Sequence, residues 1–187
     1  MRIGVAVALF LAIQACVATW VYHHDPGRVL ASHSPSYEMP ALALLENGRF
    51  WTAPGSGEPQ IHRTPGYPAL IAVSYALFGR NPVVVIGIQI LMNCAMLVLV
   101  RGMAGRVSVA AGWAAALLLA IDVTCFASAQ YLLTETFFTL QLVLYVVLWI
   151  EMRRSTAHES RHNVLAAVSG VVLATMALTR PIAYYLP

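Results

Sequence analysis

The sequence predicts an all-α membrane protein, a bundle of several transmembrane helices. Hydrophobic residues make up 59% of the 187 residues and charged residues only 10%, and the mean hydropathy is +0.72. A water-soluble domain needs more charge than this to cover its surface. Apolar runs about as long as a bilayer is thick recur along the chain, which indicates a polytopic protein.

Charge and cysteine content argue against three other kinds of protein or site. The formal net charge is only +3, and the arginines are spread along the chain, unlike those of a nucleic-acid-binding surface. Cys16, Cys94 and Cys125 all lie in apolar runs without short spacing, so they indicate neither a disulfide framework nor a zinc site. We expect them to pack as small hydrophobic side chains.

The first apolar run, residues 3–21, has the length of a spanning helix. A signal peptide is the alternative, but the run is longer than a usual signal-peptide core and no small-x-small cleavage motif follows it. We therefore expect an uncleaved first span.

Residues 22–81 are expected to form a polar outer loop that carries two short interfacial helices. One face of the first helix is formed by Tyr37, Ala41, Leu44, Leu45 and Gly48, and an Asn-Gly stop ends it. Ser34 or Ser36 can cap this helix, and Pro40 sits near its first turn, where a missing amide costs least. The second helix, residues 67–78, is apolar but too short to cross about 30 Å of hydrocarbon.

Four more apolar runs predict four more spans, which gives about five in all. They are residues 83–100, 107–121, 134–150 and 164–178, of which the last is short. The chain ends in "TRPIAYYLP", which is typical of a turn into a further span. We therefore expect residues 1–187 to be the N-terminal portion of a larger transmembrane domain.

The basic residues predict the orientation of these spans. They lie at the N-terminus and in the short loops after residues 83–100 and 134–150, whereas residues 122–133 carry Asp122 and no basic residue. By the positive-inside rule the N-terminus and the arginine-containing loops are cytoplasmic. The long loop, residues 122–133 and Arg180 are then expected outside, in a bacterial inner membrane.

Arg63 is the strongest single candidate for a binding residue. It lies where the polar loop meets the second short helix, and Pro65 and Pro68 stiffen this approach. Helix N-termini attract anions, and an arginine fork beside one suits a phosphate. At a membrane interface that phosphate would belong to a lipid. The alternative is an arginine that simply extends its charge to the headgroups.

Two acidic residues lie at membrane boundaries. Glu135 opens the run 134–150, where a carboxylate is costly unless it is paired or faces water, so it is a functional candidate. Its alternative role is to complement the dipole of the helix that it opens. Asp122 is expected to be a turn residue.

The loop histidines raise the alternative of a metal site. His23, His24, Asp25, His33 and His62 are suitable ligand types, but adjacent histidines are a poor chelating arrangement and nothing else fixes their geometry. We predict no metal and no other cofactor, although a divalent metal is the alternative. Each ionisable loop residue can equally be polar because it is solvated.

Three stretches resemble a known family. "SYEMPALALLENGRFW…GEPQIHRTPGYPALIAVSYALFG" resembles the first outer loop of the GT-C membrane glycosyltransferases, in their bacterial protein-mannosyltransferase and aminoarabinose-transferase branch. "LLTETFFTLQLVL" resembles the acidic start of that family's fourth span, and "LTRP" its next basic turn. The residues that carry the resemblance are Tyr37, Ala41, Leu44, Gly48, Arg63, Pro65, Tyr67, Phe78 and Gly79.

The resemblance implies an enzyme with its active site on the outer face of the membrane. Its donor would be a polyprenyl-phosphate-linked sugar, its acceptor is not identified, and Arg63 would hold the carrier phosphate as it leaves. Tyr37, Glu135 and Arg180 would shape the site.

A loop aspartate is the family's usual base, but His33 occupies that position here. Asp25 or Glu38 would then take the role of the base, with His33 as a further candidate. The alternatives are a lipid-carrier-binding or transport protein without chemistry, and an inactive fragment.

Overall fold

The computed structural model describes residues 3–25, 34–154 and 159–181, and within these ranges the chain is entirely helical apart from turns and loops. The expected all-α class is confirmed. The helices are α1 (Ile3–His24), α2 (Pro35–Asn47), α3 (Gly66–Phe78), α4 (Pro82–Ala104), α5 (Val109–Ile121), α6 (Val123–Ser128), α7 (Thr134–Arg154) and α8 (Glu159–Thr179). An isolated bridge between Trp51 and Pro59 closes the loop between α2 and α3.

Four of the described helices are long and apolar enough to cross a membrane. They are α1, α4, α7 and residues Ser160–Thr179 of α8, each 20 to 23 residues long. At about 1.5 Å of rise per residue, such helices match the hydrocarbon thickness of a bilayer. Four of the five expected spans therefore have the required length, and the chain has the character of a membrane protein.

The expected span at residues 107–121 is shorter than a spanning helix. It corresponds to α5, which has 13 residues and so a length of about 20 Å. Asp122 ends it, because its carboxylate accepts the backbone N–H groups of Thr124 at 2.8 Å and Cys125 at 3.0 Å and so starts the separate helix α6. The turn role expected of Asp122 is confirmed.

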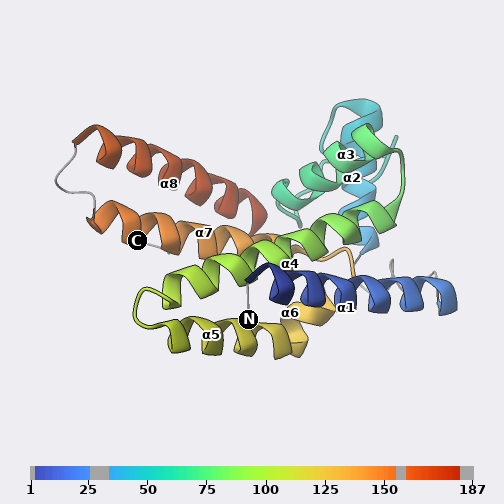
Figure 1. Cartoon of the computed structure of the whole chain (residues 1–187). Helices are drawn as coiled ribbons and strands as arrows, with labels where there is room; N and C mark the ends of the chain where they lie inside the picture. The colour runs from blue at the N-terminus through green and yellow to red at the C-terminus, as the bar shows by residue number, and fades with distance from the viewer. Residues whose placement is uncertain (1–2, 26–33, 155–158, 182–187) are drawn as a thin grey trace.

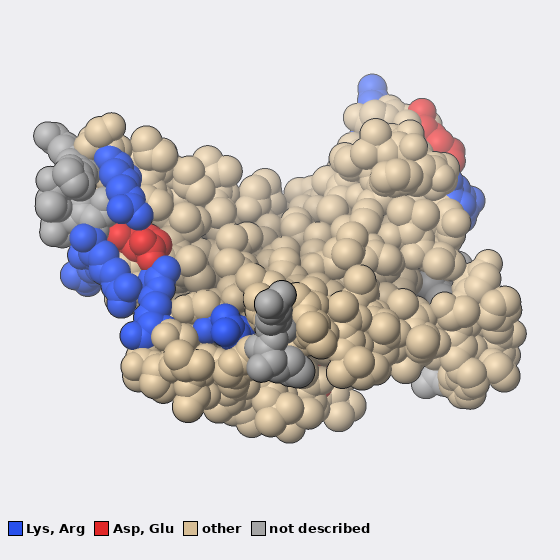
Figure 2. Space-filling view, in the orientation of Figure 1, with Lys and Arg blue, Asp and Glu red and all other residues tan. Residues whose placement is uncertain are grey.

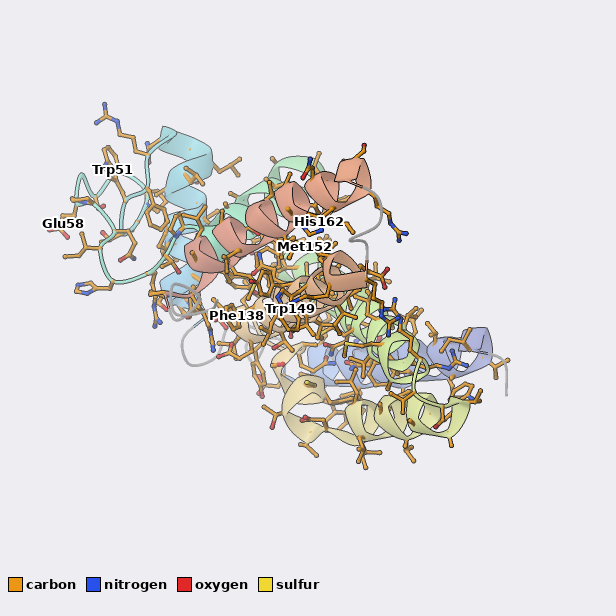
Figure 3. All side chains as sticks on the ribbon, turned by 90° about the vertical axis from the view of Figure 1, so that its left-hand side faces the viewer. Trp51, Glu58, Phe138, Trp149, Met152 and His162 are labelled. Carbon is orange, nitrogen blue, oxygen red and sulfur yellow. The ribbon has the colours of Figure 1, made fainter. Side chains whose placement is uncertain are left out.

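The long helices run alongside one another around α4, while α2 and α3 form a pair at one end of them (Figure 1). α4 packs against α1, α5 and α7, and α8 lies along α7. Figure 3 views the bundle from the end opposite to α2 and α3. It shows Met152 of α7 and His162 of α8 near the junction of these two helices. The main hydrophobic core joins α2, α3 and the first half of α4, with Tyr67 and Ile71 fully buried in it.

The charged side chains gather towards the two ends of the molecule. Between them lies a broad band without charge on the face shown in Figure 2. Many large apolar side chains point outward along this band, such as Leu9 of α1 and Val171 of α8. An apolar outer surface of this extent is expected where lipid, not water, surrounds the helices.

One end, which we call the arginine-rich end, carries five arginines from α4, α7, α8 and the turn after α4. They are Arg101, Arg106, Arg153, Arg154 and Arg161. Glu151 ties two of them together, because Arg106 and Arg161 both pair with its carboxylate. The other end carries α2, α3 and the start of α4 (Figure 1).

Buried amide side chains hold the irregular backbone between α5 and α7. Gln89 of α4 donates to the carbonyls of Ala129 at 3.1 Å and Tyr131 at 2.7 Å, and Asn93 donates to that of Cys125 at 2.9 Å. Non-helical backbone within a membrane protein needs such internal partners, since lipid offers none. These amides therefore fix where α7 begins.

The two short helices expected within residues 22–81 are present, as α2 and α3. α2 ends at Gly48, whose φ of 64° is left-handed and whose N–H donates to the carbonyl of Leu44 at 3.1 Å, so the Asn-Gly stop is confirmed. Ser34 takes the N-cap position but makes no side-chain cap hydrogen bond. α2 packs directly on α3, so its apolar face covers protein.

Candidate functional site

A cavity of about 260 Å³ opens where the starts of α2, α3 and α7 meet the end of α8. We call it the Arg63–Arg180 cavity. Its lining comes from four separate parts of the chain: Tyr37, His62, Arg63, Thr64, Thr134, Thr179, Arg180 and Pro181.

The start of α3 is docked tightly against the end of α8. The hydroxyl of Thr64 donates to the carbonyl of Thr179 at 2.7 Å. At Gly66 the two backbones come so close that a Cβ would lie 2.7 Å from the carbonyl oxygen of Leu178, nearer than real Cβ atoms approach. Glycine is therefore required at the first residue of α3, and this contact brings Arg63 and Arg180 to the same cavity.

Tyr37 positions Arg63. A terminal nitrogen of the guanidinium, Nη1, donates to the Tyr37 hydroxyl at 3.0 Å, and its central carbon lies 4.6 Å from the centre of the tyrosine ring. Tyr37 is itself held edge-to-face against Tyr67 at 5.5 Å. Among the described residues Arg63 makes no ion pair, so its positive charge is not neutralised by a carboxylate.

Arg180 is held from three sides. It forms an ion pair with Glu135, its Nε donates to the hydroxyl of Thr134 at 3.0 Å, and its guanidinium lies 5.6 Å from the ring centre of Phe138. One carboxylate oxygen of Glu135, Oε2, is buried and has no hydrogen-bond partner among the described residues. Glu135 thus lies in the first turn of α7 and reaches the cavity through its ion pair with Arg180.

The electrostatics of the cavity suit an anion. Two guanidinium groups line it and one nearby carboxylate compensates only one of them. The N-terminus of α7 begins at Thr134 in the lining and adds a partial positive charge. A planar guanidinium binds the oxygens of phosphate in pairs, so a phosphate group is the anion that this arrangement fits best.

Four of the residues selected from the sequence are brought together by the fold. Tyr37, Arg63 and Arg180 line the cavity, and Glu135 reaches it through its pair with Arg180. In the sequence these residues are spread over four separate segments, and the packing of α2 on α3 and of α8 against α3 and α7 joins them.

Glu38 lies elsewhere. Its carboxylate is buried, accepts the Tyr75 hydroxyl at 3.0 Å and lies 3.5 Å from Nε of Arg80. Burial and then the charge of Glu38 raise the pKa of Tyr75 above its ordinary value. The residue after Tyr37 on a helix points about 100° away from it, so the structure does not bring Glu38 to the cavity, and it ties α2 to α3 instead.

Asp25, another of the proposed bases, is also not among the lining residues. Asp25 is exposed just beyond the end of α1, and its backbone N–H donates to the carbonyl of Val21 at 2.8 Å. His33 lies outside the described residues. Glu58 sits with Trp51 in the loop after α2, well apart from Phe138 beneath Arg180 (Figure 3). Within the part of the chain that the structure describes, no three potential metal ligands come together.

His62 also belongs to the site, although the sequence analysis considered it only as a possible metal ligand. It lines the cavity, and its backbone N–H donates to the side-chain oxygen of Gln60 at 2.8 Å. Its position next to Arg63 was the available signal, because a neighbour of a site arginine in a short loop stays near the same cavity. Thr134 and Thr179 carried no comparable signal.

Comparison with protein-family models, curated proteins and solved structures gave no significant match. The functional argument therefore rests on the geometry of the cavity and on the resemblance of the loop sequence.

Proposed function

We propose that the Arg63–Arg180 cavity binds the phosphate of a polyprenyl-phosphate-linked sugar and that the protein is a GT-C-type glycosyltransferase. One observation carries the proposal: two arginines from distant segments line one cavity, and a single carboxylate lies beside them. A cavity with this excess of positive charge favours an anion with several oxygens.

The position of the cavity supports a lipid phosphate over a free one. It lies at the start of α7 and the end of α8, which are both long and apolar enough to span a membrane. A phosphate bound at these helix ends can remain attached to a polyprenyl tail that lies in the bilayer. By the positive-inside rule the arginine-rich end faces the cytoplasm, so the cavity faces the outer side of a bacterial inner membrane.

The proposed reaction is a displacement at the sugar's anomeric carbon. An acceptor hydroxyl forms the new C–O bond, the bond from carbon to the phosphate oxygen breaks, and the electron pair leaves with the phosphate. Arg63 and Arg180 stabilise the charge that develops on this leaving group. The acceptor's proton passes to a base, and His62 and Glu135 are the titratable groups at the cavity that can take it.

A second candidate function is lipid-carrier binding or transport without chemistry. The position of the expected bases favours it, because Glu38 is buried against Tyr75 and Asp25 is not in the lining. The two functions share the phosphate site and differ only in whether sugar is transferred.

The first experiment measures binding of a short polyprenyl monophosphate, farnesyl phosphate, to the full chain in detergent, with the uncharged alcohol farnesol for comparison. We expect Arg63→Gln to lower affinity for the phosphate by about tenfold to a hundredfold, since charge-assisted hydrogen bonds are lost. Arg49→Gln is the matched control, because Arg49 lies over Trp51 in the loop after α2. Equal binding of farnesol, or normal phosphate binding by Arg63→Gln, would remove the proposed site.

The second experiment separates the two functions. Membranes that contain the full chain are given a radiolabelled polyprenyl-phosphate sugar, and label released from the carrier is followed. His62→Gln and Glu135→Gln should both lower the release of label. The His62→Gln variant should still bind farnesyl phosphate as the parent chain does. Normal binding of the carrier without any release in the parent chain would favour the carrier-binding function.

A further inference from the structure

A second cavity, of about 220 Å³, lies at the arginine-rich end, where α4 turns into α5. We call it the Arg101–Arg106 cavity. It is lined by Arg101, Gly102, Gly105, Arg106, Val109 and Gly112. Nothing in the proposed glycosyl transfer uses this cavity.

Three glycines give the cavity its shape. Gly105 ends α4 with its N–H donated to the carbonyl of Arg101 at 2.8 Å. At Gly112 a Cβ would lie 2.9 Å from that same carbonyl oxygen and 2.9 Å from the Cα of Gly105. The start of α5 therefore crosses the end of α4 at backbone distance, and two arginines flank a hollow without bulky side chains.

The charge of this cavity is not fully compensated. Arg106 is paired with Glu151, which it shares with Arg161. Arg101 makes no ion pair among the described residues, and its Nε is buried without a hydrogen-bond partner there. Its guanidinium is held 4.4 Å from the centre of the Trp113 ring. Figure 2 shows that several arginines and one acidic patch gather at this end of the molecule.

An apolar groove continues from this cavity towards the middle of the molecule. It has a volume of about 280 Å³ and lies between α1, α4 and α5. We call it the α1–α5 groove. Trp113 links the two hollows, because its ring holds Arg101 at one side and lines the groove.

One face of α5 lines both hollows without a break. Val109 and Gly112 line the cavity, and Trp113, Ala116, Leu117, Ala120 and Ile121 line the groove. The spacing of three and four residues places them in a single stripe along the helix. α4 repeats the pattern, since Leu97 lines the groove and Arg101, one turn further, lines the cavity. The combined lining therefore passes from basic, at Arg101 and Arg106, to apolar along α5.

We propose that the Arg101–Arg106 cavity and the α1–α5 groove together bind an anionic phospholipid. Its phosphate lies against Arg101, and one acyl chain lies in the groove beside Trp113 and Leu117. Basic pockets between membrane helices are suited to anionic headgroups, and the groove wall includes Leu9 and Leu117, which are largely exposed and so open to the bilayer. A charged head joined to an apolar tail matches both ends of the stripe.

The test measures binding of dioleoylphosphatidylglycerol and dioleoylphosphatidylcholine to the full chain in detergent by native mass spectrometry. Phosphatidylglycerol should bind preferentially, and Arg101→Gln should weaken its binding by about tenfold. Arg154→Gln is the matched control, because Arg154 is exposed at the same end but lines neither hollow. Leu117→Trp is expected to fill the groove and weaken binding of phosphatidylglycerol without weakening that of inorganic phosphate. Thermal unfolding of each variant shows whether the fold is retained.

Three results would overturn the proposal. Equal losses in Arg101→Gln and Arg154→Gln would mean that positive charge attracts lipid without a specific site. If inorganic phosphate displaces phosphatidylglycerol and Leu117→Trp does not change phosphatidylglycerol binding, the cavity takes a free anion. Equal binding of phosphatidylcholine would mean that the negative charge plays no part. None of these results depends on farnesyl phosphate binding at the opposite end, so the two sites succeed or fail independently.

Discussion

The two arginine-lined cavities of the molecule are built from the chain in different ways. Each is lined by a pair of arginines, and among the described residues one arginine of each pair is in an ion pair and the other is not. The Arg101–Arg106 cavity is built by one helix-turn-helix segment, residues 101–112. The Arg63–Arg180 cavity needs four segments, and one of its key contacts joins residues 115 positions apart.

The difference shows why one end depends on long-range packing more than the other. A local turn forms its cavity whenever α4 and α5 form. The Arg63–Arg180 cavity exists only if α7 begins at the right place and α8 ends against α3, so changes far from any arginine should affect it first.

Removal of the Gln89 amide should have the largest effect. Gln89→Leu removes the side-chain partner of the Ala129 carbonyl and of the Tyr67 hydroxyl, and it leaves the Tyr131 carbonyl with only the backbone N–H of Leu133. Each buried polar group without a partner costs about 1–3 kcal/mol, so we expect these two groups to cost about 2–6 kcal/mol together. Asn93→Leu should cost less, because the carbonyl of Cys125 that loses the Asn93 amide still accepts the hydroxyl of Ser128.

The measurement is thermal unfolding in detergent together with binding of farnesyl phosphate and phosphatidylglycerol. Gln89→Leu should lose farnesyl phosphate binding before phosphatidylglycerol binding, because the start of α7 is displaced. Equal weakening at both ends would show that the bundle unfolds as one unit and that the contrast between local and distant assembly does not hold.

Gly66→Ala should come second. The added Cβ would lie within 2.8 Å of both the Leu178 carbonyl and the Thr179 hydroxyl, so α3 and α8 must separate. Overpacking of this kind costs about 1–3 kcal/mol. Gly87→Ala in α4 is the matched control, because its Cβ would meet nothing within 4 Å. We expect farnesyl phosphate binding to fall in Gly66→Ala and to stay unchanged in Gly87→Ala; the reverse order would place the contact elsewhere.

Alkaline pH should have the smallest effect, and it should act on the end that carries α2 and α3. Burial, and then the charges of Glu135 and Glu38 respectively, raise the pKa values of Tyr67 and Tyr75. The folded chain therefore keeps these protons where the unfolded chain loses them. The corresponding stability is complete below about pH 10 and declines as pH rises above it.

Unfolding temperatures measured between about pH 9 and pH 11 check this sign. They should fall with rising pH, and Tyr75→Phe should reduce the slope. Tyr22→Phe is the comparison, since Tyr22 is exposed on α1. If unfolding temperature falls with pH at the same slope in the parent chain, Tyr75→Phe and Tyr22→Phe, the buried tyrosines do not control alkaline unfolding.

The sequence by itself determined the class of the protein and most of its helices. Low charge and long apolar runs predicted the all-α membrane fold, and the Asn-Gly pair predicted the end of α2. These are local properties, because burial preference and backbone freedom depend on the residues themselves. The turn role of Asp122 was also predicted from the sequence. The shortness of α5 was not, because it follows from the capping of the separate helix α6 by Asp122.

Only the tertiary structure decided which polar residues meet. Arg63 and Arg180 share a cavity because Gly66 lets α3 touch α8, and Glu38 is buried against Tyr75 because α2 packs on α3. Side-chain chemistry identifies which residues can bind a phosphate or take a proton. Where each one points depends on contacts between segments that are distant in the chain, and no local pattern encodes those contacts.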